Sequence, residues 1–142
     1  MSSDKDIAIR TYHWLLEASG TLPQRASSGL AEDGLTITPF RVLNLLRVRG
    51  PLPQKDVAKY IWRSVSTVGL LAASLERKGL IARQGDTSDG RLVILSLTPK
   101  GLELLERAVP KHVAQIEGAM SNLSRSECER LVELLDKLAP EW

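Results

Sequence analysis

Two short strand-like runs separated by a polar loop constrain the fold of this 142-residue chain more than any other feature. The runs are residues 80–84 and 91–97, and the second contains Leu-Val-Ile-Leu. Between them lies Gly-Asp-Thr-Ser-Asp-Gly, a composition typical of turns. Two such runs joined by such a loop predict a β-hairpin. The segments on either side have helical patterns, so we expect the hairpin to belong to a mostly helical fold.

Two helices are predicted in the segment that leads toward the hairpin. Thr38 and Pro39 form a helix start signal, because a hydroxyl cap is followed by proline at the first helical position. This strongly apolar helix is predicted to end at residues 50–51, which are glycine and proline. A short helix is then predicted over residues 53–61, with its apolar side chains facing inward. These are Val57, Ala58 and Ile61.

A third helix is predicted over residues 65–78, with Ser64 as its cap and Gly79 in the left-handed position after its end. Helix, short helix, helix and hairpin, in that order, predict a winged helix-turn-helix. In that fold the third helix enters a DNA major groove, and the hairpin reaches the backbone or the minor groove. The buried stripe of the third helix is predicted from its spacing of i, i+3, i+4 and i+7. Its members are Val68, Leu71, Ala72 and Leu75.

Long helical segments flank this core. Residues 7–30 are helix-compatible, and we expect a bend or break near Gly20 and Pro23. A second long helix starts at Thr98-Pro99 and runs to about residue 120, with a kink expected at Pro110. A capping box, Ser124 to Glu127, opens a last helix rich in leucine. The apolar stripes of the first and last helices need a partner, which predicts a dimer.

Charge and composition narrow the function. Residues 41–100 contain 11 Lys or Arg and 4 Asp or Glu, whereas the rest of the chain is acidic. A basic middle suggests a separate partner for that segment. One cysteine, Cys128, and two histidines leave no disulfide framework or multi-cysteine zinc site. No apolar run has membrane-spanning length, no signal peptide pattern is present and no catalytic motif is visible. We therefore expect a cytoplasmic protein that is not an enzyme and needs no cofactor.

Several stretches together resemble the MarR family of bacterial transcriptional regulators, over about residues 7–138. The most specific is the wing motif Asp89-Gly-Arg91 followed by Leu97-Thr98-x-x-Gly101; the others include Gly50-Pro-Leu-Pro-Gln-Lys-Asp-Val-Ala and Leu75-Glu-Arg-Lys-Gly-Leu-Ile. The resemblance implies a homodimer that binds a near-palindromic operator in double-stranded DNA, usually as a repressor. It further implies release by a small organic ligand, often an aromatic acid. The implied division is 1–34 and 99–142 for dimerisation helices and 35–98 for the DNA-binding core.

The resemblance also implies the DNA-binding residues. Arg91 matches the arginine that enters the minor groove, and Asp89 its acidic partner, while Arg83 is either a phosphate neighbour or merely exposed. Relatives usually carry a basic residue where this chain has Leu70 and often Ser74. Hydroxyls can bond phosphates or either base edge, and Leu70 fits a thymine methyl. The full set is Gln54, Ser64, Ser66, Thr67, Leu70, Ser74, Arg83, Asp89 and Arg91.

A ligand pocket is expected where the flanking helices meet the core. Tyr12, Trp14 and Leu16 belong either to this pocket or to the dimer interface, and Trp62 either borders the pocket or packs on the core. Arg47 or Arg63 is a candidate to meet a ligand carboxylate, with a solvated position or a DNA contact as the alternatives for each. His13 and His112 are expected at the surface or interface, with ligand binding as the alternative. Two other functions stay open: a winged-helix protein-interaction module, and a constitutive DNA binder without ligand sensing.

Overall fold

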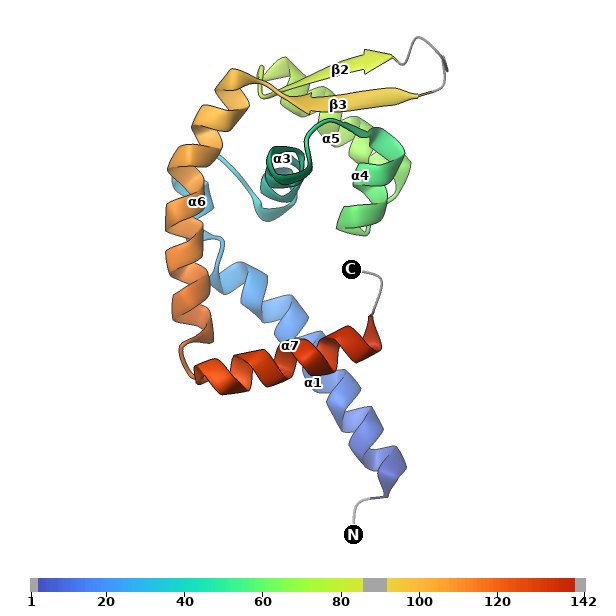
Figure 1. The fold of residues 1–142 in the computed structure, drawn as a ribbon, viewed down its shortest axis with the longest axis vertical. Coiled ribbons are helices and arrows are strands. Elements are labelled where there is room, and N and C mark those ends of the chain that lie inside the picture. Colours follow the sequence, from blue (N-terminus) through green and yellow to red (C-terminus); the bar gives the residue numbers. More distant parts are fainter. Residues whose placement is uncertain (1–2, 86–91, 140–142) are drawn as a thin grey trace. The chain divides into compact units, whose positions relative to one another are not determined.

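A computed structural model describes residues 3–85 and 92–139 of the chain. The chain divides into two compact units, of which one is Ser27–His112 and the other combines Met1–Ala26 with Val113–Trp142. The described part is mostly helical with one small antiparallel sheet, which confirms the predicted fold class (Figure 1). The elements are α1 (Asp4–Arg25), α2 (Ser28–Glu32), α3 (Ile37–Arg49), β1 (Leu52–Pro53), α4 (Gln54–Ile61), α5 (Val65–Arg77), β2 (Ile81–Gly85), β3 (Val93–Leu97), α6 (Pro99–Met120) and α7 (Arg125–Leu138).

The sheet contains the predicted hairpin and one strand that the sequence did not reveal. Strands β2 and β3 pair antiparallel, from Ile81 opposite Leu97 to Gly85 opposite Val93. The strand order is β1-β3-β2, so β3 is central, and Leu52 of β1 lies opposite Leu95. The predicted loop between β2 and β3 includes residues 86–91, which lie outside the described residues. The hairpin prediction is therefore confirmed for its strands.

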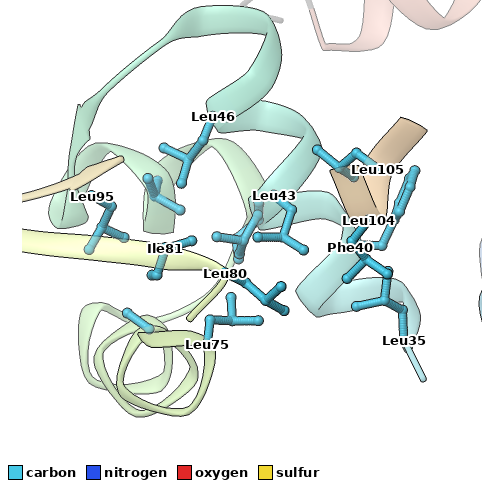
Figure 2. Close-up of a cluster of buried hydrophobic side chains, with 14 of the residues drawn as sticks. Leu35, Phe40, Leu43, Leu46, Leu75, Leu80, Ile81, Leu95, Leu104 and Leu105 are labelled. Carbon is cyan, nitrogen blue, oxygen red and sulfur yellow. The ribbon is translucent and has the colours of Figure 1, made fainter. Parts of the chain in front are cut away.

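One apolar core holds the Ser27–His112 unit together. Helices α3 and α5, the hairpin and the first half of α6 each contribute leucine or isoleucine side chains (Figure 2). The stripe predicted for α5 is confirmed, because Val68, Ala72 and Leu75 are buried and Leu71 packs against them. The inward side chains predicted for α4 are buried too. Burial of one such side chain contributes about 1.5–3 kcal/mol, so this core fixes the placement of α5.

The start of α6 is fastened to the junction between α5 and β2. The Thr98 hydroxyl donates to the Gly79 carbonyl at 2.6 Å, and the Thr98 N–H donates to the Leu80 carbonyl at 3.1 Å. Lys100 Nζ donates to the Lys78 carbonyl at 2.8 Å. Gly79 has φ +74°, the left-handed conformation predicted for it. The Thr98-Pro99 start signal is confirmed, since Thr98 Oγ1 also accepts from the Gly101 N–H at 3.1 Å.

The start of α3 differs from the prediction. Helix α3 begins at Ile37 with Thr36 in the cap position, so Thr38 is not the cap. Pro39 is consequently the third helical residue and not the first. Proline is tolerated there because the first four N–H groups of a helix have no partner within it. A proline in the first turn therefore indicates a helix start only to within a few residues.

The N-terminal segment also differs from the prediction. Helix α1 continues through Gly20 and Pro23 and ends at Arg25, and the short helix α2 begins at Ser28. Proline removes one hydrogen bond from a helix, and an exposed helix can satisfy the freed carbonyl with water. Helix α6 runs as one helix through Pro110, and the kink expected there stays a prediction.

The other compact unit contains α1, the end of α6 and α7. Both α1 and α7 lie wholly within the described residues, and neither contains a buried side chain. The capping box predicted at Ser124 is present, with Ser124 Oγ accepting from the Glu127 N–H at 3.2 Å. Apolar side chains are exposed along both helices. They are Ile7, Ile9, Tyr12, Trp14 and Leu16 on α1, and Val132, Leu134, Leu135 and Leu138 on α7.

Candidate nucleic-acid interface

The N-terminus of α5 is built from hydroxyl side chains. Ser64 caps the helix as predicted, since its Oγ accepts from the Thr67 N–H at 3.1 Å. The same hydroxyl lies 2.7 Å from Thr67 Oγ1 and 3.2 Å from Ser66 Oγ. All three side chains are exposed. The first turn of α5 therefore presents an uncharged group of hydrogen-bond donors and acceptors to solvent.

The outward face of α5 is centred on Leu70. An α-helix turns about 100° per residue, so Leu70 lies on the side opposite Val68 and Ala72, each two residues away. Its side chain is 78% exposed. Ser66, Thr67 and Ser74 flank it on the same face, with Ser74 half-buried. The face that a helix-turn-helix presents to a groove is thus uncharged around its centre.

Gln54, at the start of α4, lies against α5 at Gly69. A Cβ atom built on Gly69 would be 3.0 Å from Gln54 Nε2, closer than ordinary van der Waals contact. Gly69 thus leaves room for the Gln54 carboxamide beside the outward face of α5. Close packing against Gln54 is therefore a structural reason for glycine at this position.

Three cations lie beside the N-terminus of α5. Lys55, Lys59 and Arg63 line an open groove of about 470 Å³, together with Asp56, Ala58, Ser64 and Val65, so the groove holds three cations and one carboxylate. Within the described residues, none of the three cations forms an ion pair with a carboxylate within 4.0 Å. Lys55 and Lys59 were not among the DNA-binding residues expected from the sequence. Their spacing of four residues, away from the inward-facing stripe of α4, was the signal that could have found them.

A further cation, Arg41 on α3, lies near Arg63. Its guanidinium is half-buried and donates to the Ile61 carbonyl at 3.4 Å. Burial lowers the pKa of Arg41, and the neighbouring Arg63 lowers it further. Arginine is effectively always protonated in proteins, so Arg41 keeps its positive charge beside Arg63. Two like charges held together favour an anion nearby, and a phosphate would suit them.

Arg83, the hairpin arginine that lies within the described residues, is paired with a carboxylate. Arg83 on β2 forms an ion pair with Glu76 of α5, with Nη2 3.0 Å and Nε 3.2 Å from Glu76 Oε1. The hydrogen bonds from Arg83 lower the pKa of the Glu76 carboxyl. This pair ties β2 to the end of α5. Asp89 and Arg91, the predicted minor-groove pair, lie outside the described residues.

Trp62 does not pack on the core. Its side chain is 68% exposed, so of the two positions expected for Trp62, bordering the ligand pocket or packing on the core, the second is wrong. Trp62 ends α4 in the left-handed conformation, with φ 57° and ψ 46°. That backbone turn directs the chain out of α4 and into α5, and the indole follows it to the surface. Such a conformation is unusual for a residue other than glycine.

The remaining pocket residues occur in both compact units. Tyr12, Trp14 and Leu16 are exposed on α1. Trp14 lines a hollow of about 310 Å³ formed by one face of α1 alone, together with Asp6, Ile9, Arg10, His13 and Glu17. Arg47, on α3, donates to Asn44 Oδ1 at 2.9 Å. The predicted ligand pocket therefore stays a prediction.

His112 is buried, contrary to the expected surface or interface position. It is 8% exposed, and its ring meets the Phe40 ring edge-on with centroids 4.7 Å apart.

Over residues 3–85 and 92–139, no three His, Cys, Asp or Glu side chains are grouped to hold a metal ion. In the same part of the chain, no helix is long and apolar enough to span a bilayer.

Known proteins are similar to this chain in sequence and in fold. The sequence pattern of the MarR family matches residues 35–93, the segment that contains α3, α4, α5 and β2. YkoM, an HTH-type transcriptional regulator of Bacillus subtilis, is 32% identical over 130 residues, which cover 92% of this chain and 84% of that protein. The chain belongs to the MarR family of transcriptional regulators.

Solved structures extend the MarR comparison. Sco3205, a MarR family regulator from Streptomyces coelicolor solved in complex with DNA, is 26% identical with a TM-score of 0.83. The match covers 98% of this chain and 88% of that one. BpsR of Bordetella bronchiseptica, whose DNA binding is regulated by 6-hydroxynicotinic acid, is 28% identical with a TM-score of 0.84. That match covers 92% of this chain and 98% of BpsR, so the MarR fold extends over nearly the whole chain.

Proposed function

We propose that this MarR-family regulator is a repressor that binds a near-palindromic operator as a homodimer and leaves it when a small organic anion binds. The observation that carries the DNA-binding part is the arrangement around α5. The centre of its outward face, at Leu70, is uncharged and exposed, and three cations without an ion pair among the described residues lie beside its N-terminus. Hydroxyls and an apolar side chain suit base edges, and cations suit phosphates.

The chemistry of each side chain suggests which part of the DNA it contacts. Lys55, Lys59 and Arg63 would contact the phosphate backbone and set affinity and register. Ser66, Thr67 and Leu70 would face the major groove. Arg91, with Asp89, would take the minor groove. Gln54, Ser64, Ser74 and Arg83 remain proposed contacts or supports at the edges of this surface.

A labelled duplex from the region upstream of the protein's own gene tests the DNA-binding proposal. We expect the wild type to bind that duplex tightly, and a variant with Lys55→Gln, Lys59→Gln and Arg63→Gln to bind it weakly. Lys5→Gln, at the start of α1, is a matched control for loss of one exposed lysine. A wild type that binds neither this duplex nor fragments of it would favour the protein-interaction alternative.

The homodimer proposal rests on the exposed apolar faces of α1 and α7. Exposed apolar surface of this extent marks an interface, and a two-fold dimer places two copies of α5 about 34–36 Å apart, one turn of DNA. Light scattering at micromolar concentration tests the proposal. A dimer mass is expected, and a monomer mass contradicts it.

The effector is proposed to be an aromatic acid. The support is the likeness to BpsR, whose DNA binding responds to 6-hydroxynicotinic acid. Tyr12, Trp14, Leu16, Arg47 and Trp62 are the proposed contacts. A coupling of ~1–3 kcal/mol would release DNA by 5–150-fold. We would titrate 6-hydroxynicotinic acid, other aromatic acids and their thioesters into the DNA complex. If no acid changes the affinity for DNA, and calorimetry detects no heat of binding to the free protein, the ligand proposal is wrong. The protein would then be a constitutive DNA binder.

A further inference from the structure

The most exposed large apolar side chain in the described part of the chain is Leu70. It stands at the centre of the outward face of α5, in the second turn of the helix. Burial against the core does not explain a leucine in this place. Its neighbours on the face bear hydroxyls, so the side chain forms a single apolar knob in a polar surface.

The outward face also lacks the side chains that read guanine. Charged residues of α5 are confined to its last two positions, Glu76 and Arg77. Glu76 is held by Arg83, and Arg77 lies seven residues beyond Leu70, about 10 Å along the axis. A helix-turn-helix contacts bases with the N-terminal residues of this helix. Bidentate reading of guanine O6 and N7 by arginine or lysine is therefore unavailable in the first two turns.

The major groove offers one apolar group, the 5-methyl of thymine. We propose that Leu70 packs against a thymine methyl, so that each operator half-site carries a thymine at the position where the centre of α5 enters the groove. This inference rests on the proposed DNA-binding function and adds the base that one residue selects. The hydroxyls of Ser66 and Thr67 accept any base pair, which leaves Leu70 as the discriminating contact of the first two turns.

The test begins with selection of duplexes from a random library by the full-length wild-type protein. Each thymine of the selected half-site is then replaced in turn by deoxyuridine, which removes only the methyl group. Fluorescence anisotropy gives the affinity of each duplex. Loss of one buried methyl is expected to weaken binding about fourfold per half-site. The effect should occur at one thymine near the centre of the α5 footprint.

Variants assign the effect to the residue. Leu70→Ala should bind the thymine and deoxyuridine duplexes with nearly equal affinity, and Leu70→Arg should select guanine in place of that thymine. Val48→Ala is the matched control, because Val48 is an exposed apolar residue of α3 outside the proposed interface. This control should keep the fourfold difference.

The outcomes separate the two claims. A selected site where no deoxyuridine replacement weakens the wild type overturns the inference and leaves DNA binding intact. So does a fourfold effect that Leu70→Ala retains. A library from which no site is enriched contradicts the proposed function itself, and the inference falls with it.

Discussion

Gly101 is the position where one added methyl group should harm this protein most. It is the third residue of α6 and lies directly against the hairpin. A Cβ built on Gly101 would be 2.7 Å from Leu97 Cδ1 and 3.2 Å from the Leu80 carbonyl carbon, and closer still to the Leu80 carbonyl oxygen. Carbon atoms in good contact are about 3.5–4.0 Å apart, so a neighbour must move by about 1 Å.

The backbone cannot move that far without losing a hydrogen bond. Leu97 can turn its side chain away, but the Leu80 carbonyl accepts the Thr98 N–H that fastens α6 to the hairpin. Overpacking of this kind costs about 1–3 kcal/mol. The gain in helix propensity from glycine to alanine is at most ~1 kcal/mol, and it is smaller in the first turn. We expect Gly101→Ala to lower the free energy of unfolding by about 1–2 kcal/mol.

Urea denaturation at a fixed protein concentration measures this loss, because concentration affects the apparent stability of a dimer. Gly118→Ala is the matched control: it lies in the same helix, with no atom within 4 Å of the added Cβ. The control should gain up to ~1 kcal/mol. An unchanged urea midpoint for Gly101→Ala would refute the reasoning, since it would mean that the junction between α6 and the hairpin yields freely.

Three further perturbations test local features. Ser64→Ala removes the acceptor for the Thr67 N–H and should cost about 0.5–2 kcal/mol in urea denaturation, whereas Ser64→Asp should restore the cap. Trp62→Gly removes the cost of a left-handed conformation, about 1–2 kcal/mol, but adds about 0.4–1 kcal/mol of conformational entropy to the unfolded chain. The midpoint of thermal unfolding should therefore rise, and a fall would contradict this. The lowered pKa of Glu76 stabilises the folded state above the ordinary glutamate pKa, about 4.3, and the benefit is lost as pH falls through the folded pKa. The stability difference between wild type and Glu76→Gln should therefore shrink below about pH 4; a constant difference would show that ionisation of Glu76 is not involved.

Local signals in the sequence predicted most of the core unit. The Ser64 cap, the Gly79 turn and the buried stripe of α5 each depend on neighbouring residues within one or two turns, and each is confirmed. Strand β1 was missed because two residues have no period. Leu52 and Pro53 become a strand only through pairing with β3, which lies about forty residues later in the chain.

The site was harder to predict, because exposure and pairing depend on tertiary structure. The sequence could not tell whether Trp62 packs inward, since that depends on the left-handed turn at the end of α4. It could not show that Arg83 is paired with Glu76, seven residues away on another element. Nor could it show that Gly69 makes room for Gln54. Spacing placed Leu70 on the outward face of α5, whereas the structure shows how exposed it is.

The salt dependence of DNA affinity tests the central claim most directly. If Lys55, Lys59 and Arg63 of both protomers contact phosphates, about six counterions are released, and log K should fall with log [salt] with a slope of about −5. The variant with all three cations replaced by glutamine should give a much shallower slope. A wild-type slope near zero, or a slope that the triple variant leaves unchanged, would contradict the assignment of this surface to DNA.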